Sequence, residues 1–265
     1  MKKITTTLLK QMKQEQEKFS CLTAYDASFA HAQEAAGVEV ILVGDSLGMV
    51  IKGQNSTLSV TMDEMVYHTK NVSRACDKSL IMADLPFASD VTKEQTYQSA
   101  ARLIGEGGAH MVKIEGGAAL LKTVEFLSQR GVAVCSHLGL LPQSVYKLGG
   151  YRIQGRTDEA AEQILADALA LDQAGADSLL LECVPAELAA RITEQVEVPV
   201  IGIGAGADCD AQVLVCYDML GLHQGYPASF VKNFLADADS IQGAFKAYVE
   251  QVKSGEFPGP EHTFK

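Results

Sequence analysis

Short apolar runs recur along the chain, and segments with a helical spacing of apolar residues separate most of them. A short continuous apolar run is typical of a strand buried on both faces, whereas apolar residues every three or four positions are typical of a helix that packs on one face. The segment after Thr157 has the helical spacing, with apolar residues at 161, 164, 165, 168 and 169. Eight runs are expected to be strands: 19–26, 38–45, 79–87, 110–117, 132–140, 178–184, 198–206 and 212–220.

Local signals mark where helices begin and end. Thr61 and Thr92 are followed three residues later by Glu64 and Gln95, a pattern in which both side chains satisfy free backbone amides of the first turn. Thr157 opens another helix, whose first turn carries acidic residues that suit the helix dipole. Glycines that suit the left-handed residue at a helix end follow several helical segments, at Gly37, Gly108, Gly131 and Gly175.

The repeated strand–helix order predicts an α/β fold of the (β/α)₈ TIM-barrel type, in a single domain over residues 1–265. A doubly wound open sheet is the alternative. The strand count favours the barrel, and the connection between the last two runs is too short for a crossover helix. We expect an N-terminal helix over 8–18 to cap the barrel bottom. A C-terminal helical extension is expected around 230–235 and 241–252.

Composition and charge narrow the class of protein. Apolar residues make up 47% of the chain and charged residues 21%, which excludes a disordered chain. No apolar stretch approaches the roughly 18 residues of a membrane span. The net charge of −11 without a Lys/Arg cluster argues against a nucleic-acid partner. The six cysteines have neither CxxC nor zinc spacing, and no signal-like segment follows Met1, so we expect a reduced cytoplasmic protein.

Polar residues gather where the expected strands end, which in a barrel is where the chemistry lies. Carboxylates are rare beside apolar runs unless something pairs with them. A lone strand-end carboxylate is often the N-cap of the next helix, and we favour that interpretation for Asp26. The strand-end residues are Asp26, Asp45, Ser46, Asp84, Lys113, Glu115, His137, Glu182 and Asp218.

Asp45, Asp84 and Glu115 are candidate metal ligands. Converging carboxylates repel each other unless a cation lies between them. The set offers only oxygen atoms, which favours Mg²⁺ or Mn²⁺ over zinc. Sparse ligation by protein would leave coordination positions for water and for substrate oxygens.

Three further residues are candidates for binding and proton transfer. Lys113 and Glu115 are two residues apart on one expected strand, so their side chains point to the same face. There the lysine either forms a structural ion pair or binds a substrate carboxylate. Glu182 follows three leucines, and apolar surroundings make a carboxylate a better base; the alternative is a pair with a basic neighbour. His137 is either a hydrogen-bond donor to substrate or a core histidine.

A glycine-rich segment, GIGAGA at 202–207, partly matches the dinucleotide-binding fingerprint. Only about five residues separate it from the next apolar run, too few for the helix that this fingerprint requires. We therefore predict a tight turn at the mouth of the seventh strand.

A divalent cation at such a site could chelate a 2-oxo acid and acidify the carbon next to the ketone. A positioned base would then remove that proton, and the cation would stabilise the enolate. The residues alone leave the electrophile open. Several motifs, in order over nearly the whole chain, resemble the ketopantoate (3-methyl-2-oxobutanoate) hydroxymethyltransferase family: VGDSLGM at 43–49, ADLPF at 83–87, VKIEGG at 112–117, HLGL at 137–140, GGYRIQGR at 149–156, LECVP at 181–185 and IGIGAG at 201–206.

This resemblance implies transfer of a hydroxymethyl group from 5,10-methylenetetrahydrofolate to 3-methyl-2-oxobutanoate, which gives 2-dehydropantoate in pantothenate synthesis. It implies that Asp45 and Asp84 bind Mg²⁺ and that Glu115 completes the metal site, directly or through water. It also implies a homodecamer built as a pentamer of dimers.

The resemblance further implies the residues that hold and deprotonate the oxo acid. Ser46 and Lys113 bind it, with help from the backbone near Asp45 and Asp84. Glu182 accepts the proton, and His137 contacts the substrate. The alternatives are another Mg²⁺-dependent 2-oxo acid enzyme, of the phosphoenolpyruvate mutase/isocitrate lyase type or a class II-like aldolase, and a non-catalytic binding protein on the same barrel.

Overall fold

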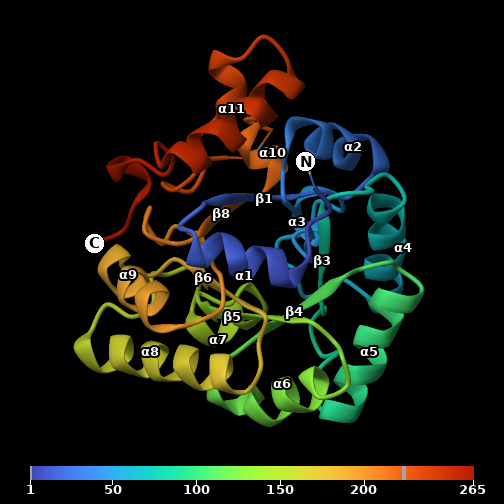
Figure 1. Ribbon diagram of the computed structural model, residues 1–265, viewed down its shortest axis with the longest axis vertical. Helices are drawn as coiled ribbons and strands as arrows, with labels where there is room; N and C mark the ends of the chain where they lie inside the picture. Colours follow the sequence, from blue (N-terminus) through green and yellow to red (C-terminus); the bar gives the residue numbers. More distant parts are fainter. Residues whose placement is uncertain (1, 223–224) are drawn as a thin grey trace.

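The computed structural model describes residues 2–222 and 225–265, in which the strands close into a parallel barrel (Figure 1). Each strand pairs with the next along the chain, and the last pairs with the first. The predicted (β/α)₈ barrel is confirmed, and the open sheet is excluded because this sheet has no edge. The strands are β1 (Phe19–Thr23), β2 (Val40–Val43), β3 (Leu80–Asp84), β4 (Met111–Glu115), β5 (Val134–Gly139), β6 (Ser178–Glu182), β7 (Val200–Ile203) and β8 (Ala211–Leu214).

Helices surround the barrel on its outer side (Figure 1). The longer ones are α2 (Ala27–Ala36), α4 (Met62–Ser73), α5 (Lys93–Gly105), α6 (Leu121–Ser128), α8 (Asp158–Gln173), α9 (Ala186–Gln195) and α11 (Ile241–Ser254). Shorter helical turns lie in the connections: α3 (Leu47–Val50), α7 (Val145–Leu148), α10 (Cys216–Met219), and the 3₁₀ turns η1 (Ala118–Leu120), η2 (Pro142–Ser144), η3 (Phe234–Asp237) and η4 (Pro260–His262).

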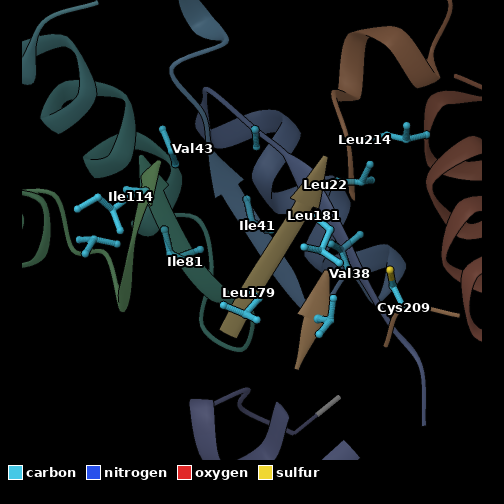
Figure 2. Close-up of a cluster of buried hydrophobic side chains, with 14 of the residues drawn as sticks. Leu22, Val38, Ile41, Val43, Ile81, Ile114, Leu179, Leu181, Cys209 and Leu214 are labelled. Carbon is cyan, nitrogen blue, oxygen red and sulfur yellow. The ribbon is translucent and has the colours of Figure 1, made fainter. Parts of the chain in front are cut away.

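Alternate residues of each strand serve two separate apolar layers, because successive strand side chains point to opposite faces. Ile41, Ile81 and Leu179 belong to the layer between strands and helices, which Figure 2 shows. Ile114 lies in the same layer, as its place between Lys113 and Glu115 requires. The neighbouring positions fill the barrel interior: Phe19, Cys21, Val40, Leu42, Leu80, Met82, Met111, Cys135, Leu180, Ile201, Ala211 and Val213.

The N-terminal helix α1 (Thr6–Gln14) covers one end of the barrel. Its Leu9 and Met12 are buried and join the interior cluster. Lys13 Nζ donates to Asp210 Oδ2 at 2.8 Å and to the Thr193 carbonyl at 2.7 Å, which ties the helix to segments before β7 and β8. The helix therefore closes the end of the barrel where the strands begin.

Local signals hold in most places. Thr61 and Glu64 form the expected reciprocal capping box. Thr92 caps its helix by accepting from Gln95 N, but the Gln95 side chain donates to the Ala88 carbonyl, so the second predicted box is only half formed.

All six cysteines are free. Within the described part of the chain, no helix is long and apolar enough to cross a bilayer.

Two predicted elements differ from the observed ones. The run 212–220 is not one strand, because β8 ends at Leu214 and Cys216–Met219 is a helical turn. Thr23 Oγ1 accepts from Cys216 N at 2.9 Å, which satisfies an amide at the start of this turn. A continuous apolar run cannot distinguish a strand from a buried helix. The helix expected over 230–235 is instead the 3₁₀ turn η3.

Candidate active site

A cavity of about 680 Å³ lies at the ends of the strands, opposite α1. Asp84, Glu115 and Glu182 are the last residues of β3, β4 and β6 and occupy inward-facing positions. Leu42, Leu180 and other apolar interior residues also line the cavity. The structure brings all seven predicted site residues to this one cavity: Asp45, Ser46, Asp84, Lys113, Glu115, His137 and Glu182.

Lys113 is a buried cation among carboxylates. It pairs in register with Asp84 of the neighbouring strand, and its Nζ lies 3.1 Å from Asp84 Oδ1 and 3.8 Å from Glu115 Oε1. Burial opposes its charge, but Asp84 and Glu115 together raise the pKa of Lys113 above its ordinary value. The ion pair weighed as one alternative is therefore present, and binding of a substrate carboxylate stays a prediction.

Asp45 and Asp84 lie side by side. The backbone amide of Asp45 donates to Asp84 Oδ2 at 3.0 Å, and each residue is 3% exposed. Burial, followed by the charge of Asp84, raises the pKa of Asp45 well above its ordinary range. The two carboxylates therefore repel each other, and a bound cation would relieve that repulsion.

His137 lies between two carboxylates. Its Nδ1 is 3.5 Å from Glu115 Oε1, and its Nε2 is 3.3 Å from Glu182 Oε2. Burial and nearby Lys113 oppose protonation of the ring, but Glu115 and Glu182 outweigh them and raise the pKa of His137. Burial opposes ionisation of Glu115, but His137 and Lys113 outweigh it and lower the pKa of Glu115. The imidazole therefore lies between the buried carboxylate and the one nearer the mouth, and its Nδ1 is also 3.3 Å from Lys113 Nζ.

Glu182 is the more accessible end of this chain of groups, with 15% of its side chain exposed against 4% for Glu115. The next residue, Cys183, has φ +48°, which is uncommon for a residue other than glycine. Its amide donates to the Ile203 carbonyl, and its carbonyl accepts from Gln154 N, both at 2.9 Å. These bonds hold the turn after Glu182. The surroundings are less apolar than the sequence indicated, because His137 faces the carboxylate.

Ser46 lies beside Asp45 at the start of α3. Its Oγ is 2.8 Å from the hydroxyl of Tyr25, a side chain that is only 2% exposed. The chain is closely packed here, since a Cβ on Gly44 would lie 2.6 Å from Ser46 Oγ. Tyr25 and the glycine together fix where the Ser46 hydroxyl stands.

Comparison with known proteins now assigns the chain. The model of the ketopantoate hydroxymethyltransferase family matches residues 3–260. The chain belongs to the ketopantoate hydroxymethyltransferase family. The 3-methyl-2-oxobutanoate hydroxymethyltransferase of Nitrosospira multiformis is 56% identical over 99% of this chain and 100% of that protein. The protein of the same name from Nitrosococcus oceani is 58% identical over 97% and 98%. The resemblance seen in the motifs is confirmed.

Solved structures outside the ketopantoate hydroxymethyltransferase family share the fold. A phosphonopyruvate hydrolase matches with a TM-score of 0.62 and 12% identity, over 81% of this chain and 80% of its own. A 2,3-dimethylmalate lyase matches with a TM-score of 0.60 and 17% identity, over 82% of each chain. At these identities the likeness concerns the barrel alone.

The remaining strand-end residues of this family member have different roles. Asp26 is the N-cap of α2, accepting from the amides of Ser28 and Phe29, which confirms the capping interpretation. Asp218 lies in α10 rather than at the end of a strand, and it lines the cavity. The glycine segment forms the predicted turn after β7, with φ +58° at Gly204.

Sequence reasoning missed Gln143, Tyr25 and Tyr151. Gln143 donates to Asp45, Tyr25 bonds Ser46, and half-exposed Tyr151 lines the cavity. These positions depend on residues that are far apart in the chain, so no local sequence pattern predicts them. The only signal for Gln143 is Pro142 before it, which suits the first position of a helical turn after the His137 motif.

The donor set of this hydroxymethyltransferase-family site fits a hard cation. Asp45, Asp84 and Glu115 offer only oxygen atoms, and the buried Asp84 Oδ1 and Glu115 Oε1 lie 3.1 and 3.8 Å from Lys113 Nζ. Over residues 2–222 and 225–265, no three His, Cys, Asp or Glu side chains form a group able to hold a metal ion by themselves. Asp45 and Asp84 would therefore supply two ligands, and water or substrate the others, which is how proteins commonly bind Mg²⁺.

Proposed function

We propose that this protein transfers the hydroxymethyl group of 5,10-methylenetetrahydrofolate to 3-methyl-2-oxobutanoate, giving 2-dehydropantoate. The observation that carries the proposal is the row Glu182–His137–Glu115 beside Lys113 and the Asp45–Asp84 pair in one cavity. Such a site supplies a base, a cation for an anionic substrate and ligands for a metal. The family membership supports the same reaction.

Lys113 and Ser46 would hold the oxo acid. The ammonium group lies at the cavity wall, and at 4% exposure it is hardly solvated, so a substrate carboxylate would meet little competition from water. The Ser46 hydroxyl, fixed by Tyr25, would donate a hydrogen bond to a substrate oxygen.

Asp45 and Asp84 would hold Mg²⁺, and Glu115 would act through a water molecule. The bound ion would polarise the keto oxygen and make the neighbouring C–H more acidic. Glu115 already accepts from Gln143 N at 3.0 Å and lies near His137, so its place in the site is fixed by these contacts.

Glu182 would accept the proton from C3 of the oxo acid. His137 would orient this carboxylate and stabilise its charge. The carbon that has lost its proton would then bond to the methylene carbon of the folate, while both C–N bonds of that methylene carbon break and water supplies the hydroxyl group. The C3 proton and the proton released by water would end on the two folate nitrogens, so that tetrahydrofolate leaves. The folate would enter beside Tyr151 and Leu222, which line the cavity and are exposed.

The decisive experiment follows deuterium exchange at C3 of 3-methyl-2-oxobutanoate, with and without Mg²⁺ and tetrahydrofolate. Glu182→Gln should lower exchange at least about 100-fold, the usual contribution of a general base, while Mg²⁺ binding persists. Glu187→Gln, on the exposed side of α9, is the matched control and should exchange normally. Undiminished exchange in Glu182→Gln would place the base elsewhere.

A second variant tests the metal ligands. Asp84→Asn should raise the Mg²⁺ concentration needed for half-maximal exchange by an order of magnitude or more, because a charged ligand is lost. Mg²⁺-dependent exchange without product formation from 5,10-methylenetetrahydrofolate would favour the alternative of another 2-oxo acid enzyme. Ligand binding without any exchange would favour the non-catalytic barrel.

Two wider features belong to the same proposal. We expect a homodecamer, and exposed apolar side chains such as Tyr67, Phe87 and Val91 suit contacts between subunits. We also expect the protein to act in the reducing cytoplasm, where its six free thiols would stay reduced.

A further inference from the structure

Gln143 contacts the ends of three strands or the loops after them. Its side-chain Nε2 donates to Asp45 Oδ2 and to the Leu85 carbonyl, both at 2.9 Å. Its backbone amide donates to Glu115 Oε2 at 3.0 Å. Gln143 itself lies in η2, in the connection after β5. One residue therefore joins the regions that follow β2, β3, β4 and β5.

These contacts leave the amide group no freedom to turn. An amide nitrogen has two hydrogens, and here each has its own acceptor. The Leu85 carbonyl holds the amide on one side, so its second hydrogen is aimed at Asp45 Oδ2. That carboxylate cannot rotate without losing the bond, and its orientation is fixed before any cation arrives.

We propose that Gln143 is a positioning residue for the metal site: it fixes the rotamer of Asp45 so that the carboxylate is preorganised for a divalent cation. The inference rests on the proposed metal-binding role of Asp45 and Asp84. Partners that orient a metal ligand typically change metal affinity by 10- to 100-fold when they are lost.

The choice of side chain at position 143 suits this task. A glutamate there would have the same length, but it would add another negative charge beside Asp45 and could not donate to the Leu85 carbonyl. A lysine would compete with the metal for the carboxylates. A neutral amide donates to both acceptors and adds no charge of its own to the metal site.

The test compares Gln143→Met with the wild-type protein. Methionine keeps the length and loses both donors. Mn²⁺ binding, measured from the electron paramagnetic resonance signal of the free ion, should weaken about tenfold or more. The Mg²⁺ concentration for half-maximal C3 exchange should rise by the same factor, while exchange at saturating Mg²⁺ stays within about threefold.

Gln154→Met is the matched control, because Gln154 Nε2 donates to the nearby Arg152 carbonyl rather than to a residue of the site. It should bind Mn²⁺ like the wild type. Unchanged Mn²⁺ affinity in Gln143→Met would overturn the inference, and so would a loss of exchange that saturating Mg²⁺ does not restore. If the wild-type protein binds no Mn²⁺, the proposed metal site itself fails, which is a separate result.

Discussion

The thiol of Cys76 lies partly buried near the carboxylates of Glu34 and Asp77. Burial first, and then these two charges, raise its pKa from 9.0 to about 12. Since the thiolate is the reactive form, each pH unit of increase lowers its population at a given pH about tenfold. Cys76 in the native protein should therefore react with iodoacetamide at pH 8 about a thousandfold more slowly than a thiol of ordinary pKa.

The measurement is labelling followed by mass spectrometry over pH 7–10. The rate at Cys76 should rise about tenfold per pH unit over the whole range, because the pKa lies above it. Cys135, Cys209 and Cys216 also have pKa values raised to about 12 and are buried, so they should stay unlabelled. Denatured protein, with all six thiols reactive, is the control. Rapid labelling of native Cys76 at pH 8 would contradict the argument.

Residue by residue, the sequence was informative where chemistry and strand register coincide. The sequence placed three charged residues at the same end of the barrel: Asp84, Lys113 and Glu115. A carboxylate or a lysine at the end of an apolar strand must point inward or be paired. Gln143 could not, because it meets Asp45 across 98 residues of chain and lies in a turn. Whether Lys113 pairs with protein or substrate depends on distances that no sequence pattern contains.

The helix α2 depends on its N-cap. Asp26 Oδ1 accepts from the Ser28 and Phe29 amides at 2.8 and 3.0 Å, which satisfies two of the free donors of the first turn. Asp26→Ala should lower the free energy of unfolding by about 1 kcal/mol, the typical value of such a cap. Urea denaturation followed by circular dichroism measures it.

Ser28→Ala, in the exposed first turn of the same helix, is the matched control and should be close to neutral. The Asp26→Ala protein should exchange C3 deuterium at the wild-type rate, because its carboxylate serves the helix rather than the cavity. A large loss of exchange without a loss of stability would show that Asp26 belongs to the active site after all.

Elements were predictable where two signals agreed. A threonine cap with an acidic partner at Thr61, or a glycine of positive φ at Gly37, fixed helix ends that the structure reproduces. The run 212–220 was marked only by its hydrophobicity, which a strand and a buried helical turn share. The strand ends at Leu214, and the amide of Cys216 then donates a hydrogen bond to Thr23 Oγ1, about 190 residues away. Long-range partners decided the element there.

Helix α11 packs over the seam where the first and last strands pair. Tyr248 is fully buried, and its hydroxyl lies within hydrogen-bond distance of the Cys21 carbonyl of β1, at 2.9 Å, and of the Gln212 carbonyl of β8, at 2.8 Å. Tyr248→Phe should lower the free energy of unfolding by about 1–3 kcal/mol, because buried carbonyl groups lose a donor. Tyr146→Phe, at a side chain 78% exposed, should have little effect. Equal stabilities of the two variants in urea would contradict this role.

The overall architecture followed from the number and order of apolar runs, because segments of helical length separate most of them. The sequence also placed a helix of the N-terminal segment at the bottom of the barrel, where α1 lies, but it did not indicate the contacts that hold the two ends of the chain. Lys13 donates a hydrogen bond to Asp210, and the Tyr248 hydroxyl lies within hydrogen-bond distance of carbonyl groups of β1 and β8. These residues are far apart in the chain and come together only in the folded barrel.

The helix α1 seals the barrel where the strands begin, so the cavity has its access at the opposite end. Apart from water, the two substrates and two products of the proposed reaction would then use the same end of the barrel. In the proposed reaction the small oxo acid would occupy the inner position, next to Lys113, and the larger folate the outer one. Kinetics should consequently be ordered, with the oxo acid first on and its hydroxymethylated product last off.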